Sequence, residues 1–148
     1  FTEYHPQWSP EGQEIAFVTD RGPGSDEARL LFGDYDLALY DLNRKTVRLL
    51  THLPGDVTNP QWSPDAREIA FISEHQGIPN IYLLELASGR IDPVTHLLNG
   101  VSGITATTPA FSWSGDGSTL VFSAFDDGSW QLYRLDLNNL LVDLAARR

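Results

Sequence analysis

The stretch Pro60–Phe71, with the sequence PQWSPDAREIAF, decides the fold because the chain contains it three times. The first copy, Pro6–Phe17, reads PQWSPEGQEIAF, and the third, Phe111–Phe122, reads FSWSGDGSTLVF. In each copy a Trp lies seven residues before the first apolar residue of the next predicted strand. The pattern indicates a strand, a tight turn and a second strand.

The residues between the Trp and the second strand favour a turn. Pro10 and Pro64 fix φ at the first corner, the following acidic residue can bond to nearby backbone, and Gly12 and Gly117 tolerate positive φ. The second copy has Ala66 in place of Gly, and we expect this change to be tolerated at some cost in turn rigidity.

Two further strands are predicted after each pair. The third strands are Leu37–Leu42, Ile81–Leu86 and Leu132–Leu137, and the fourth are centred on Val47, Ile91 and Val142. Four short strands per unit, repeated along the chain, are typical of β-propeller blades. Residues 140–148 could instead form a short helix, because Leu, Ala and Arg are good helix formers.

The spacing of the units supports this interpretation. Trp8 and Trp62 are 54 residues apart, and Trp62 and Trp113 are 51 apart. The first unit has 10 extra residues between its second and third strands, and the link into the third unit has 7 extra. Without them both intervals are 44 residues, as expected for a blade of roughly 40–50 residues. We predict an all-β fold with three four-stranded antiparallel blades, at about 1–53, 54–97 and 98–148, in a single propeller segment. Trp8, Trp62 and Trp113 are its structural repeat positions.

The motif Pro-x-Trp-Ser-Pro-Asp/Glu-Gly, followed by Ile-Ala-Phe, Ile-Tyr and Leu-Thr, resembles the propeller repeat of TolB and its relatives, a WD-like propeller family. The resemblance covers nearly the whole chain. It implies a ring of six blades, of which this chain would form half, and a periplasmic or secreted location, although a cytoplasmic one stays open. The same repeat occurs in the propellers of peptidases.

Three blades cannot close a ring, since known propellers have about 4–8. An open arc leaves an apolar face at each end, and we find no polar replacement of the repeat pattern at either end. We therefore expect one of two arrangements. Two chains close head to tail as a homodimer, or further blades of a longer TolB-like chain complete the ring.

Composition narrows the classes of partner. The formal charge of −10 argues against nucleic acid, which requires a basic surface, and fits a basic protein or a cation. No apolar run approaches the length of a membrane span, so we expect no membrane insertion. The hydrophobic fraction of 41% can supply a core, and there are no cysteines.

The order of strands places two long insertions, at 21–36 and 98–108, on one face around the mouth of the central channel. Loops on a rigid scaffold often carry binding sites. The candidate binding residues on this face are Asp20, Arg21, Asp26, Glu27, Glu74, His75, Asp126, Asp127 and Trp130. For Phe125 and Trp130 we consider packing between blades the more common use.

The sequence gives little support for a metal site or a catalytic site. The loop carboxylates could bind Ca²⁺, but no spacing resembles an EF-hand, so we predict no metal and no cofactor. His52 and His96 occupy equivalent repeat positions, which indicates a structural role rather than a zinc site. The sequence has no Gly-x-Ser-x-Gly elbow, no phosphate-binding Gly loop and no Cys. We predict that this chain contains no catalytic residues and is not an enzyme.

Three functions remain as hypotheses. The first is a non-catalytic protein-interaction scaffold that uses the face with the long loops. The second is the propeller segment of a prolyl-oligopeptidase-like peptidase, whose catalytic domain lies outside this chain. The third is an engineered or ancestral-type half propeller whose only function is to assemble.

Overall fold

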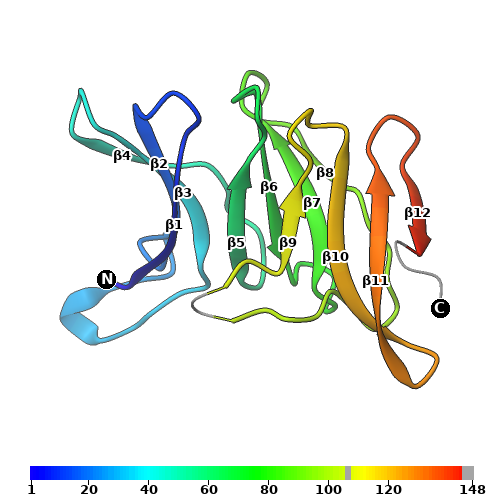
Figure 1. Ribbon diagram of the computed structural model, residues 1–148. Helices are drawn as coiled ribbons and strands as arrows, with labels where there is room; N and C mark the ends of the chain where they lie inside the picture. Colours follow the sequence, from blue (N-terminus) through cyan, green and yellow to red (C-terminus); the bar gives the residue numbers. More distant parts are fainter. Residues whose placement is uncertain (106–107, 145–148) are drawn as a thin grey trace.

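The computed structural model describes residues 1–105 and 108–144, and for 141–144 it describes the backbone alone. The fold is all-β, with three four-stranded antiparallel sheets that each consist of consecutive strands (Figure 1). The first sheet contains β1 (Glu3–Trp8), β2 (Glu14–Thr19), β3 (Asp36–Asp41) and β4 (Thr46–Leu49). The second contains β5 (Val57–Trp62), β6 (Glu68–Ser73), β7 (Asn80–Glu85) and β8 (Ile91–Pro93). The third contains β9 (Phe111–Trp113), β10 (Thr119–Asp126), β11 (Ser129–Asp136) and β12 (Leu141–Leu144).

Within the described residues the helical structure is a single 3₁₀ turn, η1 (Glu27–Arg29). The predicted last strand is therefore present as β12, and the alternative helix is wrong for residues 141–144. Residues 145–148 lie outside the described part of the chain. No helix in the described ranges combines the length and the apolar character that crossing a membrane would require.

The middle sheet is buried on both faces, as its unbroken apolar run Ile69–Ile72 predicts. Ile69 and Phe71 belong to the core cluster shared with the first sheet, whereas Ala70 and Ile72 belong to the cluster shared with the third. Successive side chains of a strand point to opposite faces, so one strand supplies both cores. The sheets therefore stack face to face, as propeller blades do.

Hydrogen bonds between the first strands of the sheets fix this stacking. Trp62 Nε1 donates to the carbonyl of Gln7 at 3.2 Å, and Trp113 Nε1 donates to the carbonyl of Gln61 at 3.3 Å. Trp62 and Trp113 thus each reach the equivalent carbonyl of the preceding sheet. Trp8 belongs to the first sheet, which no other sheet of the described residues precedes, and it is 60% exposed, whereas Trp62 is 9% exposed. The three Trp residues share a repeat position but not an environment.

The repeat turns adopt the expected backbone. Gly12 and Gly117 have φ of +69° and +74°, and Ala66, at the equivalent position, has φ of +59°. In the same turn the Ser63 hydroxyl donates to Asp65 at 2.7 Å. A side chain with a Cβ is strained in this left-handed region, so the cost expected for Ala66 is backbone strain.

The two terminal faces of the stack differ. The outer face of the first sheet carries a groove of about 340 Å³, where the apolar side chains Ile15, Phe17, Tyr40 and Val47 meet the charged Glu3 and Arg21. No sheet formed by the described residues covers that groove.

The outer face of the third sheet is partly polar. Leu120 and Phe122 belong to the core, so the alternating pattern of β10 and β11 puts Ser123 and Arg134 on the opposite face. The positions equivalent to Ser123 and Arg134 are Ile72 and Leu83 in the second sheet and Val18 and Leu39 in the first. The prediction that no polar residue interrupts the pattern at either end is therefore wrong for the third sheet, because alternation directs these two side chains outward.

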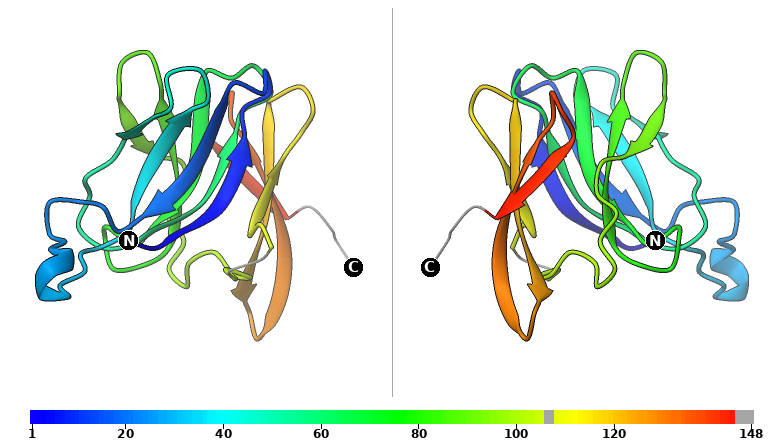
Figure 2. Two further views of the ribbon diagram at one scale, coloured as in Figure 1. Left: turned by 90° about the vertical axis from the view of Figure 1, so that its left-hand side faces the viewer. Right: turned by 90° about the vertical axis from the view of Figure 1, so that its right-hand side faces the viewer.

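Short turns lie along one edge of the stacked sheets, and the longer links lie along the opposite edge (Figures 1 and 2). We call the second edge the long-loop face. It consists of the links 20–35, 50–56, 74–79 and 94–110 and the tip of the β10–β11 hairpin, 125–130. This hairpin, in orange, extends beyond the neighbouring strands.

Candidate binding face

Charge is distributed unequally between the two edges. The long-loop face, as defined above, carries eight carboxylates and two arginines, a formal charge of −6. The six short turns of the opposite edge carry three carboxylates and four basic side chains, a formal charge of +1. The acidity of the chain is thus concentrated where both long insertions lie.

The first long loop holds four of the predicted site residues, but they do not form one cluster. Asp20 is buried and its Oδ1 accepts a hydrogen bond from the backbone of Thr2 at 2.8 Å. Arg21 points away from it and forms an ion pair with Glu3. Asp26 caps η1, and Glu27 lies exposed in its first turn. Asp20 therefore has a structural role at the start of the chain, whereas Glu27 faces solvent.

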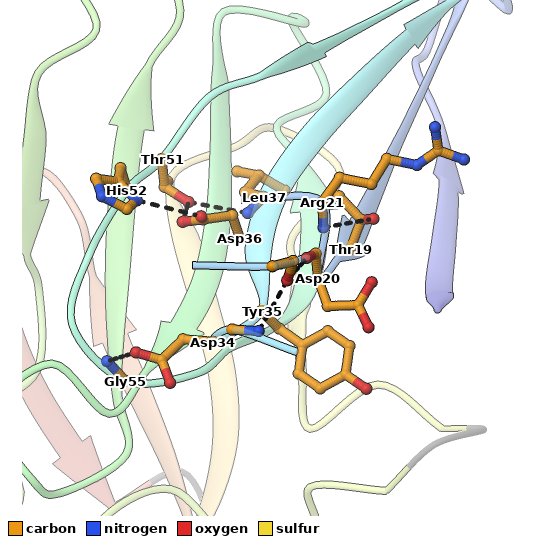
Figure 3. Close-up of polar contacts among 12 residues, drawn as sticks. Thr19, Asp20, Arg21, Asp34, Tyr35, Asp36, Leu37, Thr51, His52 and Gly55 are labelled. Carbon is orange, nitrogen blue, oxygen red and sulfur yellow. Dashed lines mark hydrogen bonds and ion pairs between the residues drawn. The ribbon is translucent and has the colours of Figure 1, made fainter. Parts of the chain in front are cut away.

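A second buried carboxylate organises the end of the first sheet (Figure 3). The Thr51 hydroxyl donates to Asp36 at 3.0 Å and accepts from the backbone N–H of Leu37 at 2.9 Å. His52 Nδ1 lies 3.5 Å from Asp36, on a side chain that is otherwise mostly exposed. The arrangement fixes the link from β4 to β5 against the start of β3.

The second sheet repeats this arrangement with an amide in place of the acid. The Thr95 hydroxyl donates to Asn80 Oδ1 at 2.8 Å and accepts from the backbone of Ile81 at 2.8 Å. His96 follows Thr95 as His52 follows Thr51, and it is also exposed. The equivalence of the two histidines is thus a consequence of the Thr network beside them.

Acidic side chains also converge beneath the first loop. Asp34 accepts from the backbone of Gly55 at 2.9 Å, and Asp56 accepts from that of Tyr35 at 3.0 Å (Figure 3). Burial raises the pKa of Tyr4 to about 12, and Tyr35 and the negative charges of Asp56 and Asp20 add to the rise. Backbone N–H groups satisfy these carboxylates, so they hold the loops in place.

The first strands carry a hydrogen-bonded ladder that sequence reasoning missed. The ring of His5 accepts from the backbone N–H of Asn59 at 3.2 Å, and Asn59 Oδ1 accepts from that of Ala110 at 3.2 Å. All three residues lie three positions before a repeat Trp, which is the signal that could have found them. Asn59 Nδ2 is, within the described residues, the buried side-chain polar atom left without a hydrogen-bond partner. A pocket of about 120 Å³ opens beside His5 and Asn59.

The β10–β11 hairpin presents the remaining predicted residues. Trp130 is 67% exposed and packs edge to face against Phe125, with 5.1 Å between ring centroids. Alternation along β10 and β11 places both side chains on the outer face of the third sheet, so the expectation that they pack between blades stays a prediction. Tyr133 donates to Asp126 at 2.5 Å, and this hydrogen bond raises the pKa of Tyr133. Asp127 lies at the turn with φ of +46°.

The nine predicted residues therefore share one face without forming one pocket. Glu74 and His75 lie exposed in the link after β6. Exposed apolar side chains accompany the acids on this face, and they are Leu30, Leu31, Phe32, Leu98, Phe125 and Trp130. Within the described residues no three or more His, Asp or Glu side chains converge as a metal ion would require.

Four-stranded sheets that stack face to face and bond through a repeat Trp define a segment of a β-propeller. The model of the dipeptidyl peptidase IV (DPP IV) N-terminal region family matches residues 31–139, and the chain belongs to this family.

Relatives by sequence include the Tol-Pal system protein TolB of Alcanivorax borkumensis, which is 34% identical over 116 residues. That match covers 78% of this chain and 24% of the relative. The chain thus spans about a quarter of the length of this curated relative.

Solved structures with the same fold include TolB from Acinetobacter baumannii, with a TM-score of 0.73 and 22% identity over 95% of this chain and 31% of that one. A puromycin-hydrolysing peptidase of Mycobacterium tuberculosis has a TM-score of 0.72 and 19% identity, over 97% of this chain and 22% of that one. Both kinds of protein share the stacked sheets described above.

Proposed function

We propose that the chain is a non-catalytic interaction segment of a β-propeller, which binds a protein partner through the long-loop face. The observation that carries this proposal is the coincidence, on one edge, of a formal charge of −6 and six exposed large apolar side chains. Exposed apolar patches with a charged surround mark protein-binding surfaces. The sign of the charge favours a partner with a basic surface.

We also propose that further sheets cover both terminal faces and complete a ring. Trp62 and Trp113 each donate to a carbonyl of the preceding sheet, and Trp8 lacks such a sheet. A covering sheet would bury the groove at Ile15 and Phe17 and offer Trp8 an acceptor.

Two sources could supply these sheets, a second copy of the chain or a longer polypeptide. In a head-to-tail pair, the third sheet of one copy would meet the first sheet of the other. Ala110 would then stand where His5 and Asn59 supply acceptors, and Arg134 would face a mainly apolar groove whose lining also includes Arg21 and Glu3. These mismatches favour sheets of different sequence, as in a longer TolB-like chain, over a homodimer.

Sedimentation equilibrium over a range of concentrations separates the two sources. The chain has a mass of 16.5 kDa, so a homodimer would give a measured molar mass of twice that value. We expect no discrete dimer. A monodisperse species of twice the monomer mass that persists on dilution would restore the second copy as the source.

Paired neutralising variants test the long-loop face, with immobilised poly-L-lysine as the probe. Asp26→Asn with Glu27→Gln removes two charges from this face, and Glu11→Gln with Asp65→Asn removes two from the opposite edge. We expect the first pair to weaken binding about 2–5-fold and the second to leave it within a factor of about 1.5. Equal effects of the two pairs would contradict the proposal.

A second candidate function, the propeller of a prolyl-oligopeptidase-like peptidase, is favoured by the family match and by the peptidase of similar fold. In that case a hydrolase domain with a serine elbow follows in the complete reading frame, and the full-length protein reacts with a fluorophosphonate probe. Absence of that reaction in the full-length protein would eliminate the peptidase. The resemblance to TolB supports a periplasmic or secreted location, and we propose that this segment uses no metal or cofactor.

A further inference from the structure

A groove lies at one end of the long-loop face, between the link from β8 to β9 and the β10–β11 hairpin. Its volume is about 290 Å³. Leu97 and Leu98 form apolar walls, Ala124 and Tyr133 also line it, and Phe125 borders it. The Asp126 carboxylate lies beside them, held by the Tyr133 hydroxyl at Oδ2. Hydrocarbon walls next to one carboxylate match the chemistry of a long basic side chain.

Bonds between the two segments hold the groove in shape. Asn99 Nδ2 donates to the carbonyl of Phe125 at 3.1 Å, and the backbone of Ser102 donates to the carbonyl of Ser123 at 2.8 Å. Gly100 has φ of +73°, and a Cβ at this position would lie 2.9 Å from Pro79 of the second sheet. The link is thus clamped between two sheets. A groove that is fixed before binding spares a ligand the cost of ordering it.

We propose that this groove binds an arginine or lysine side chain of a basic protein partner. The aliphatic stem lies along Leu97 and Leu98, and the cationic head reaches Asp126. Leu98 is 88% exposed, so its side chain is accessible to a partner. This inference rests on the proposed function of the long-loop face and names the residue type that the partner inserts there.

The probe is Nα-acetyl-arginine amide, titrated into the ¹⁵N-labelled chain at a pH of about 8. We expect a dissociation constant on the order of millimolar, as usual for a ligand of this size, with amide shifts concentrated at 97–100 and 124–126. Nα-acetyl-norleucine amide has a similar stem without the charge. We expect it to bind at least about 5-fold more weakly.

The adjacent residues Asp126 and Asp127 provide a matched pair of variants. Asp126→Asn removes the carboxylate in the groove, and we expect it to weaken binding of the arginine amide about 3–10-fold. Asp127→Asn removes the same charge at the hairpin turn, where Asn also accepts positive φ, and we expect less than about a 2-fold change. Leu98→Ser changes an exposed side chain without touching the core, and it should weaken the arginine and norleucine ligands alike.

Three results would overturn the inference: equal effects of the two aspartate variants, equal binding of the two ligands, or shifts that avoid the groove. The poly-L-lysine experiment separates this failure from that of the proposed function. If poly-L-lysine still distinguishes the two edges, the groove alone is rejected. If it does not, the binding face is rejected with it.

Discussion

Replacing Ala66 with Gly should stabilise the chain, and the structure gives the size of the effect. Ala66 has φ of +59° at a turn position where the other two repeats have Gly at +69° and +74°. A residue with a Cβ loses about 1–2 kcal/mol in this region. Replacing Ala with Gly removes this strain, but it also increases the conformational entropy of the unfolded chain, which lowers the free energy of unfolding by about 0.4–1 kcal/mol. The expected net gain in the free energy of unfolding is therefore about 0.5–1 kcal/mol.

Equilibrium urea denaturation followed by Trp fluorescence measures this gain, with all variants at one protein concentration. The midpoint should rise without a change in the m-value. Gly12→Ala is the reverse experiment. A Cβ at Gly12 meets no atom within 4 Å, so its cost is due to the backbone alone and should be about 0.5–1 kcal/mol.

Ala87→Gly is the matched control, because Ala87 is exposed in another turn and is not among the residues with positive φ. Here Gly brings only its entropic cost, so this variant should lose about 0.5–1 kcal/mol. If Ala66→Gly were no more stable than the wild type, or were destabilised as much as Ala87→Gly, backbone strain would not limit this turn.

Three further perturbations test the contacts within and between sheets. Thr95→Val leaves the buried N–H of Ile81 without its acceptor, whereas Asn80 Oδ1 keeps its bond from Leu97, and the variant should cost about 1–3 kcal/mol in urea denaturation. Trp62→Phe loses the bond to the preceding sheet and should cost about 1–2 kcal/mol by circular dichroism, whereas Trp8→Phe, which is exposed, should cost less than about 0.5 kcal/mol. The hydroxyl of Ser114 and other donors lower the pKa of Asp116 from 3.8 to about 2. Because the pKa of Asp116 is lower in the folded state, ionised Asp116 stabilises the fold at pH values above its unfolded-state pKa, and this stabilisation is lost as the pH falls toward 2. Asp116→Asn should therefore flatten the decline of the free energy of unfolding between pH 4 and pH 2.

Part of the candidate binding face could be predicted from the order of strands in the sequence. The order of strands was enough to predict that the long insertions share one edge, and the acids of that edge followed from their places in the links. It did not distinguish Asp20, which is buried and bonded to Thr2, from Glu27, which faces solvent. That difference depends on the path of a loop whose contacts lie 18 residues apart in the chain.

The sequence by itself determined the repeat, the four strands of each unit and the turn at Ala66. These features depend on residues within about a dozen positions, where side-chain alternation and turn chemistry act directly. Only the tertiary structure decided that Asn59 accepts a hydrogen bond from the backbone N–H of Ala110. It also decided that the link at Leu98 meets the hairpin at Asp126. These contacts join segments far apart in the chain, and the stacking of twisted sheets sets their geometry rather than any local preference.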